Sequence, residues 1–238
     1  MSGIRMRAVT FDVWATLLDL RAFYGLAAAE LSSITGLPRE YCSDWMSRSH
    51  AMVKEALRRG EVDEGDVIGS STRLAIGLTD PPFTHNELYS AFARAVNAVS
   101  GDELLLEGVR EVLDALRERG LKLATVGNVI FWPGYLNRIL LDRAGLSVYF
   151  SAQVYADEVR CLKPNPRIFR IALESLGEDP SGSAHVGDSP GEDFAGSLAA
   201  GMASILIRPD GDSITVDRRL RFAIVREIRD VIRVIDEL

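Results

Sequence analysis

The fold is decided by one stretch near the N-terminus, Val9-Thr10-Phe11-Asp12-Val13-Trp14-Ala15-Thr16-Leu17-Leu18. An apolar run rich in β-forming residues leads there into a single aspartate, Asp12. Residues 7–13 show no clear alternation of apolar and polar side chains, which is typical of a strand buried on both faces of a parallel sheet. Ligands of such sheets bind beyond the carboxyl ends of the strands. The stretch therefore predicts a buried first strand with a candidate functional carboxylate at its end.

The segment after this strand has helical patterns and no convincing strand. Apolar residues recur at helical spacing in three places, at 39–60, 61–78 and 84–100. Thr84 and Glu87 have the spacing of a capping box at the start of the third helix. We expect an all-helical cap domain at 19–102, inserted into a core domain made of 1–18 and 103–238.

Strands and helices alternate from about residue 105 onward. Further strands are expected at 121–128, 150–156, 183–188 and 203–209. Helices are expected at 107–120, 133–146, 165–177, 191–201 and 222–238. Such alternation implies right-handed crossovers and a doubly wound parallel α/β sheet of the Rossmann type.

The composition limits the classes of function. The 238 residues carry a formal net charge of −7, which argues against a surface for nucleic acid or anionic membranes. Cys42 and Cys161 are the only cysteines, so a disulfide framework is not expected. The first residues show no apolar core of a signal peptide and no apolar run is long enough to span a bilayer, so we expect neither a signal peptide nor a membrane span. We expect a soluble cytoplasmic protein that acts on a small molecule, and no pattern indicates an oligomeric state.

Polar residues gather at the predicted strand ends and in one extended, proline-interrupted stretch between them. These residues are Asp12, Gly127, Asn128, Lys163, Asp188 and Asp193. Three carboxylates and one lysine would therefore converge on one rim of the sheet. Carboxylates at close range repel strongly in a low-dielectric cleft, and a divalent cation relieves that repulsion. An all-oxygen donor set favours Mg²⁺ over zinc.

Four stretches, in this order, resemble the four motifs of the haloacid dehalogenase (HAD) superfamily of hydrolases. "FDVWATL" (11–17) is similar to the Asp-x-Asp-x-Thr motif, and "KLATVGN" (122–128) to the strand that ends in Ser or Thr. "LKPNPRIF" (162–169) matches the lysine motif. "VGDSPGEDFAGSLAAGM" (186–202) matches the Gly-Asp-Ser motif with a second Asp five residues after the first. The resemblance spans nearly the whole chain and implies a HAD-like core with a helical cap.

The resemblance also implies a catalytic set. Asp12 would be the nucleophile that attacks phosphorus and forms an aspartyl-phosphate, which water then hydrolyses. Lys163 would shield the phosphate from the Asp12 carboxylate, and Thr16 would help to order the loop of the first motif. The expected activity is hydrolysis of a small phosphorylated metabolite, a phosphomonoester.

A magnesium site follows from the same resemblance. Asp12 and Asp188 would bind Mg²⁺ directly, and the Val13–Trp14 region would add a backbone carbonyl. Asp193 would hold a water molecule bound to the metal.

The sequence departs from the superfamily's phosphatase pattern at two positions. Trp14 stands where phosphatases carry a second aspartate as general acid/base, and an indole N–H cannot shuttle a proton at neutral pH. Gly127 stands where a phosphate-binding Ser or Thr is expected. A backbone N–H of Gly127, or the side chain of Asn128, would have to bind the phosphate in its place.

A dehalogenase is the main alternative. An aromatic residue at the Trp14 position resembles the L-2-haloacid dehalogenases, as does the cap stretch "REYCSDWM" (39–46). In those enzymes an arginine holds the substrate carboxylate where this chain has Met46. Asp188 and Asp193 would repel that carboxylate unless a cation were bound, so the acidic pair favours phosphate hydrolysis.

A third alternative is a phospho-ligand-binding protein of this fold with little or no catalysis, because two expected catalytic residues are missing. Three further residues carry expectations of their own. Glu192 is expected to complement a helix dipole, His50 to lie on a solvated face of the cap, and His185 to be a hydrogen-bonded core residue.

Overall fold

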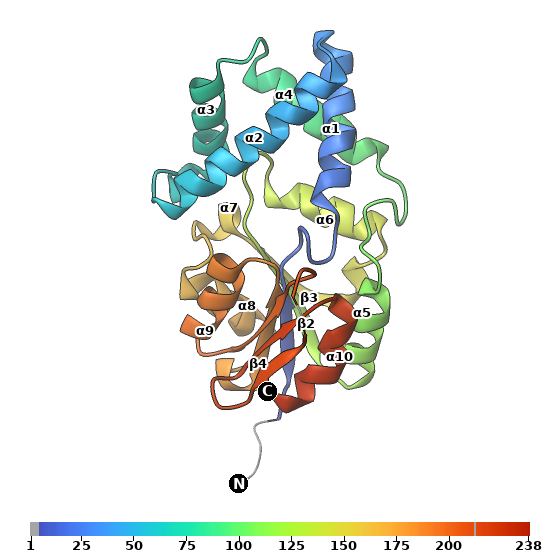
Figure 1. Ribbon diagram of the computed structural model, residues 1–238, viewed down its shortest axis with the longest axis vertical. Coiled ribbons are helices and arrows are strands. Elements are labelled where there is room, and N and C mark those ends of the chain that lie inside the picture. The colour runs from blue at the N-terminus through green and yellow to red at the C-terminus, as the bar shows by residue number, and fades with distance from the viewer. Residues whose placement is uncertain (1–4, 212) are drawn as a thin grey trace.

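The computed structural model describes residues 5–211 and 213–238. Figure 1 shows two parts stacked along the long axis, with helices alone in the upper part and a sheet flanked by helices in the lower part. We call the upper helices the cap: α1 (Leu20–Thr35), α2 (Arg39–Arg58), α3 (Val67–Thr79) and α4 (His85–Ala98). The cap lies above the carboxyl ends of the central strands.

The sheet explains why the strand-end residues meet. In the described residues its strand order is β3-β2-β1-β4-β5-β7-β6, and all neighbours are parallel except β6 and β7. The strands are β1 (Ala8–Phe11), β2 (Lys122–Gly127), β3 (Phe150–Tyr155), β4 (Ser183–Gly187), β5 (Ala203–Ile207), β6 (Thr215–Asp217) and β7 (Phe222–Val225). Phe11 pairs with Thr125 of β2 and with Val186 of β4, so the three central strands end at the same level. The predicted doubly wound α/β sheet is confirmed.

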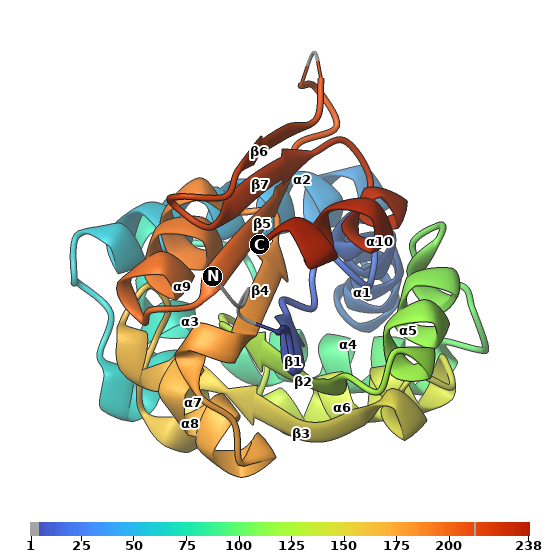
Figure 2. The same ribbon diagram turned by 90° about the horizontal axis from the view of Figure 1, so that it is seen from below.

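Helices cover both faces of this sheet. Figure 2 shows α8 and α9 on one face and α5 and α10 on the other. The core helices are α5 (Val109–Glu118), α6 (Gly134–Arg143), α7 (Ala156–Val159), α8 (Pro166–Leu176), α9 (Gly196–Ala199) and α10 (Val231–Val234). Because both faces are covered, all four residues of β1 are buried, as its unbroken apolar pattern predicts.

Local signals set the limits of the cap helices. Asp19 caps α1 by accepting hydrogen bonds from the backbone N–H groups of Arg21 and Ala22, at 2.8 and 3.1 Å. The predicted capping box of Thr84 and Glu87 is present at the start of α4.

Two chain segments join the cap to the core, and they run side by side. Leu18 forms an isolated antiparallel bridge with Leu105. The N–H of Leu106 donates to the carbonyl of Leu17 at 3.0 Å, and the N–H of Asp19 donates to that of Leu104 at 2.8 Å. The helical insertion thus leaves and re-enters the core at one place. This place is near residues 18 and 103, where the limits of the cap domain are expected, and the exact limits stay predictions.

The C-terminal region differs from its predicted structure. A single helix over 222–238 is wrong: the run Phe222–Val225 forms β7, which pairs with β5, and only Val231–Val234 forms an α-helix. The short apolar run is compatible with either structure, and the open edge of β5 decides in favour of a strand. The expected helix at 191–201 begins instead with a π-helical turn, Pro190–Ala195, before α9.

Candidate active site

Three carboxylates meet at the carboxyl ends of β1 and β4. Asp12 follows β1 directly, and its backbone N–H donates to the carbonyl of Val186 at 2.9 Å. Asp188 follows β4, and Asp193 lies in the π-helical turn beyond it. One oxygen of each carboxylate lies within 4.8 Å of the others. The topology thus brings the predicted acidic residues together.

Lys163 neutralises two of these carboxylates. Its Nζ atom lies 2.5 Å from Asp12 Oδ1 and 2.6 Å from Asp193 Oδ1, and the residue is only 4% exposed. Asn128 fixes its backbone from both sides: the Asn128 Oδ1 accepts from the Lys163 N–H at 2.8 Å, and its Nδ2 donates to the Lys163 carbonyl at 3.0 Å. Asn128 therefore positions the lysine as well as lining the cavity described below.

Asp193 is the most fully bonded of the three carboxylates. It accepts from Lys163, from the N–H of Ser189 at 2.9 Å and from His185 Nε2 at 3.1 Å. The buried His185 contacts Thr10 through its other nitrogen, at 2.7 Å, so it is the hydrogen-bonded core residue that was expected. Burial opposes ionisation of Asp193, but the charge of Lys163 and the bond from His185 outweigh it and hold the pKa of Asp193 below its usual range.

Gly187 makes this arrangement possible. A Cβ atom at this position would lie 2.3 Å from the Asp193 carboxyl carbon. Only glycine therefore lets the carboxylate approach the end of β4 this closely.

The other two carboxylates resist ionisation in the absence of a cation. Burial raises the pKa of Asp12 to about 7, with the charges of Asp193 and Asp188 adding to the shift and Lys163 opposing it. Burial, followed by repulsion from Asp193, raises the pKa of Asp188 to about 6. A dication would relieve this crowding, and three carboxylate oxygens are donors that suit Mg²⁺ better than zinc. The residues present therefore fit a magnesium ion.

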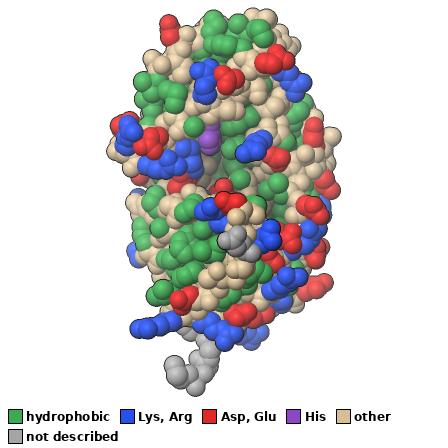
Figure 3. Space-filling model, in the orientation of Figure 1, with side chains coloured by type: hydrophobic (Ala, Val, Ile, Leu, Met, Phe, Trp, Pro, Cys, Tyr) green, Lys and Arg blue, Asp and Glu red, His purple; other side chains and the backbone are tan. Residues whose placement is uncertain are grey.

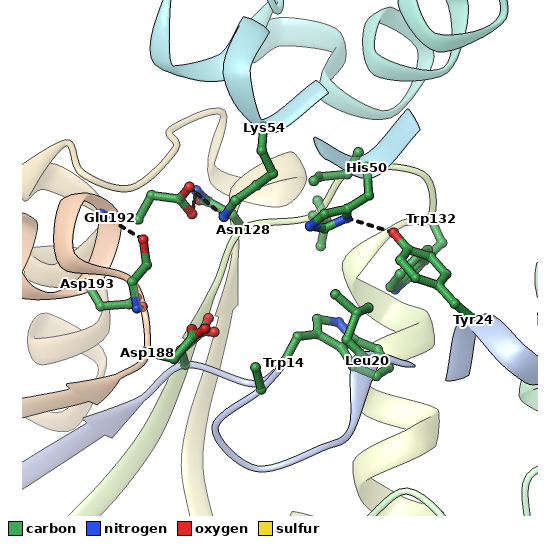
Figure 4. Close-up of a pocket in the computed structure, with 15 residues that line it drawn as sticks. Trp14, Leu20, Tyr24, His50, Lys54, Asn128, Trp132, Asp188, Glu192 and Asp193 are labelled. Atoms are coloured by element: carbon green, nitrogen blue, oxygen red, sulfur yellow. Dashed lines mark hydrogen bonds and ion pairs between the residues drawn. The ribbon is translucent and has the colours of Figure 1, made fainter. Parts of the chain in front are cut away.

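A cavity of about 140 Å³ opens between these carboxylates and the cap. Figure 3 shows a hollow in the surface between the two parts, with a histidine side chain inside it. In Figure 4, Asp188 and Trp14 lie on one side of the cavity, and His50 and Lys54 lie opposite them. The lining residues are Asp12, Trp14, Ala15, Leu20, Tyr24, His50, Lys54, Asn128, Val129, Ile130, Trp132, Asp188, Ser189, Glu192 and Asp193.

Trp14 packs as part of an aromatic cluster at the edge of this cavity. Its rings stack on Phe23 of α1 at 5.1 Å between centroids and meet Trp132 edge-on at 5.4 Å. Its indole N–H is buried and has no hydrogen-bond partner among the described residues. Trp14 thus packs the core against the cap. Its side chain has no group that could transfer a proton.

Two predicted site residues do not line the cavity. Thr16 is 1% exposed, and its hydroxyl has no hydrogen-bond partner in the described part of the chain. The loop that Thr16 was expected to order is held by the N–H groups of Leu17 and Leu18, which both donate to the Val13 carbonyl. Gly127 is buried beside Tyr155, whose ring would lie 3.1 Å from a Cβ atom at this position.

Glu192 and three polar residues of the cap complete the cavity, at places that were not predicted from the sequence. His50 and Lys54 are four residues apart, so they share one face of α2, and that face meets the core. Lys54 Nζ lies 2.5 Å from Glu192 Oε1. The other carboxylate oxygen of Glu192, Oε2, accepts a hydrogen bond from Asn128 Nδ2 at 3.1 Å. Tyr24 contacts His50 Nδ1 through its hydroxyl at 2.7 Å. The solvated face expected for His50 is therefore wrong, and Glu192 does more than complement a helix dipole.

The protonation of His50 leads to a pH prediction. Burial, then the charge of Lys54, lower its pKa from 6.5 to about 4, while Glu192 opposes the shift and Tyr24 is its neutral partner. Below pH 6.5 the unfolded chain binds a proton that the folded chain does not, so this residue's stabilisation is lost as the pH falls toward 4. We expect urea unfolding to show a steeper loss of stability from pH 7 to pH 5 in the wild type than in His50→Gln. Equal pH slopes, or an imidazole NMR signal titrating near the ordinary histidine pKa, would contradict this prediction.

The parallel sheet, the helical cap inserted after its first strand and the carboxylate–lysine cluster together define a hydrolase of the haloacid dehalogenase type. The chain belongs to the haloacid dehalogenase-like hydrolase family, whose family model matches residues 6–201. The expected superfamily and the expected class of enzyme, a hydrolase, are confirmed.

Sequence relatives extend over most of the chain. It is 32% identical over 237 residues to haloacid dehalogenase-like hydrolase domain-containing protein 3 of Mus musculus, with 94% of this chain and 89% of the mouse protein covered. It is 28% identical over 216 residues to glyceraldehyde 3-phosphate phosphatase of Methanothermobacter thermautotrophicus, with 86% and 87% covered.

Solved structures share the fold. The HAD-hydrolase YfnB of Bacillus subtilis, determined with magnesium bound, superposes with a TM-score of 0.76 at 18% identity and covers 98% of this chain and 99% of its own. L-2-haloacid dehalogenase of Xanthobacter autotrophicus superposes with a TM-score of 0.69 at 19% identity, covering 97% and 98%. At these identities the likeness concerns the fold. No helix in residues 5–211 and 213–238 is long and apolar enough to cross a membrane.

Proposed function

We propose that this hydrolase is a Mg²⁺-dependent phosphomonoesterase that uses Asp12 as its nucleophile. The observation that carries the proposal is the cluster of Asp12, Asp188 and Asp193 around Lys163, whose oxygen donors and charges suit a cation beside a nucleophilic carboxylate. The phosphatase name of the archaeal relative agrees with this proposal.

The proposed reaction has two steps. A carboxylate oxygen of Asp12 bonds to phosphorus while the bond from phosphorus to the leaving oxygen breaks, and the leaving alcohol takes up a proton from solvent. A water oxygen then bonds to phosphorus while the bond from phosphorus to the Asp12 oxygen breaks, which restores the Asp12 carboxylate; one proton of that water passes to solvent, and hydrogen phosphate departs. Bound by Asp12 and Asp188, with Asp193 holding a water ligand and the Val13–Trp14 backbone nearby, Mg²⁺ would supply positive charge that offsets repulsion between the phosphate and the carboxylates.

Lys163 and Asn128 act on the nucleophile rather than on the leaving group. Lys163 holds one Asp12 oxygen by a charge-assisted hydrogen bond, which orients the other oxygen and keeps positive charge beside the phosphate. Asn128 holds the Lys163 backbone in place. Phosphoryl transfer depends mainly on such positioning and charge neutralisation.

A dehalogenase is less consistent with the cavity. Met46 takes the position of the arginine that holds the substrate carboxylate in the dehalogenases, and its side chain is buried in the cap core rather than lining the cavity. The acidic cluster would also repel a carboxylate substrate.

One assay separates the three alternatives. Release of p-nitrophenol from p-nitrophenyl phosphate is measured with Mg²⁺ and with chelator, beside halide release from 2-chloropropionate. Phosphatase activity that requires Mg²⁺ is the expected result. Metal-independent halide release would refute the proposal, and Mg²⁺ binding without turnover of either compound would indicate a binding role.

Trp14→Asp tests whether the missing general acid limits the rate. Because Trp14 stacks on Phe23 and meets Trp132, we expect this change to lower the free energy of unfolding by about 3 kcal/mol and to give no gain in turnover. Trp14→Tyr keeps an aromatic ring and serves as the control, with a loss below about 1.5 kcal/mol. The measurements are urea unfolding and kcat for an alkyl phosphate. A higher kcat at unchanged stability would show that proton supply is limiting.

A further inference from the structure

A hydrogen-bonded pair on the cap side of the cavity has no part in the chemistry proposed above. Tyr24 is 5% exposed, and burial raises the pKa of its hydroxyl, which therefore stays protonated. Among the residues that the structure describes, its hydrogen-bond partner is His50 Nδ1, at 2.7 Å. We assign the phenol as the donor, because its buried proton would otherwise have no acceptor among the described residues; the neutral imidazole then carries its own proton on Nε2.

The Nε2–H group of His50 faces the cavity. Figure 4 shows the ring with Nδ1 turned to Tyr24 and the other nitrogen turned toward the cavity and Lys54. Within residues 5–211 and 213–238 this nitrogen makes no hydrogen bond and is not buried out of reach. Lys54, one turn along α2, is already paired with Glu192 at 2.5 Å. His50 thus presents an available donor on the cap wall, opposite Asp188.

The charge of the site selects against a second anionic group on the ligand. Four carboxylates and two lysines line or touch the cavity: Asp12, Asp188, Asp193, Glu192, Lys54 and Lys163. A bound dication would balance these charges, and a phosphate dianion would then leave a negative excess. An uncharged oxygen is therefore a better partner for the His50 N–H than a carboxylate.

The size of the cavity sets a further limit. A volume of about 140 Å³ holds on the order of ten water-sized atoms. A phosphate group and a hydrated cation occupy most of that space. Little room therefore remains inside the cavity for the leaving group, which would lie beside the apolar side chains of Leu20, Ile130 and Trp132.

We propose that His50, held in one tautomer by Tyr24, determines specificity by donating a hydrogen bond to an uncharged oxygen of the leaving group. The substrate class is the phosphate monoester of a small polyol. This inference rests on the proposed phosphatase function and deepens it. Tyr24 is a positioning residue, because its hydroxyl acts through the imidazole.

The test compares two esters of equal chain length, glycerol 1-phosphate and n-propyl phosphate, with Mg²⁺ present. We expect the wild type to favour the glycerol ester by about tenfold or more in kcat/KM. His50→Phe removes the donor and should lower kcat/KM for the glycerol ester about tenfold while changing the propyl ester less than about twofold. Tyr24→Phe, which keeps the ring packing, should shift the preference in the same direction by a smaller factor.

Two variants control for general effects on the cap. His85→Phe and Tyr41→Phe make the same substitutions at cap residues that do not line the cavity, and the preference should be unchanged. Equal losses for both esters in His50→Phe, or a preference that survives the change, would overturn the inference and leave the phosphatase proposal standing.

Calorimetric binding of the same two esters to the Mg²⁺-loaded protein separates the two proposals. If p-nitrophenyl phosphate is not hydrolysed but the wild type binds the glycerol ester more tightly, and His50→Phe loses that preference, the phosphatase proposal fails and the hydrogen bond from His50 to the polyol stands. If p-nitrophenyl phosphate is hydrolysed but neither selective turnover nor selective binding of the glycerol ester is found, the inference about His50 fails and the phosphatase proposal stands.

Discussion

Asp12→Asn is expected to lower Mg²⁺-dependent hydrolysis of p-nitrophenyl phosphate by about 10⁴-fold or more, because an amide cannot attack phosphorus in place of a carboxylate. The change also removes a buried carboxylate whose pKa is raised to about 7 by burial, with the charges of Asp193 and Asp188 adding to the shift. The fold should therefore be retained, and the metal-free variant should be no less stable than the wild type. The measurements are kcat at saturating Mg²⁺ and urea unfolding in chelator.

A matched variant separates loss of the nucleophile from a general effect of the substitution. Asp210→Asn makes the same change in an exposed ion pair with Arg208, outside the cavity, and should leave kcat unchanged. If Asp12→Asn kept activity within about tenfold of the wild type, Asp12 would not be the nucleophile.

Lys163→Met is expected to lower both the free energy of unfolding and kcat severely. Lys163 is buried against Asp12 and Asp193, and its removal leaves two carboxylates facing each other without their cation. Breaking such a buried pair lowers the free energy of unfolding by about 3–5 kcal/mol. Removing a preorganised charge beside the phosphate should lower kcat by about 10²–10³-fold.

Magnesium distinguishes the electrostatic explanation from simple loss of packing. If the carboxylates repel each other, Mg²⁺ should restore more stability to Lys163→Met than it adds to the wild type. Lys122→Met is the control, because Lys122 pairs with Glu178 at a half-exposed position and its loss should amount to less than about 1 kcal/mol. A loss of that size in Lys163→Met would contradict the prediction.

The residues at strand ends could be predicted from the sequence because topology alone brings them together. Asp12, Asp188 and Lys163 follow a buried strand or lie in an extended stretch, and parallel strands end at one edge of the sheet. These residues therefore lie at the same edge of the sheet, whatever the packing of the side chains. The C-terminal strand Phe222–Val225 could not be predicted in this way, because its apolar run is too short to separate strand from helix.

The cap side of the cavity depends on how whole helices pack against one another. His50 and Lys54 share a face of α2, but their spacing does not say whether that face meets solvent, the cap core or the sheet. The answer comes from contacts such as Trp14 with Phe23, which fix the angle of the cap over the core. The residues at the strand ends can thus be predicted from the fold alone. The cap residues that face the leaving group can be identified only in the three-dimensional structure.

The contact of Gly127 with Tyr155 couples these two positions. A serine at position 127 would press its Cβ against the Tyr155 ring, 3.1 Å away, and that ring is buried under the guanidinium of Arg138. A smaller residue at 155 would instead open a void and cost about 3 kcal/mol. At 3.1 Å the ring would have to move by a few tenths of an ångström to admit a Cβ atom at position 127, and its packing under Arg138 resists that movement. The effects of substitutions at positions 127 and 155 on the free energy of unfolding should therefore not be additive.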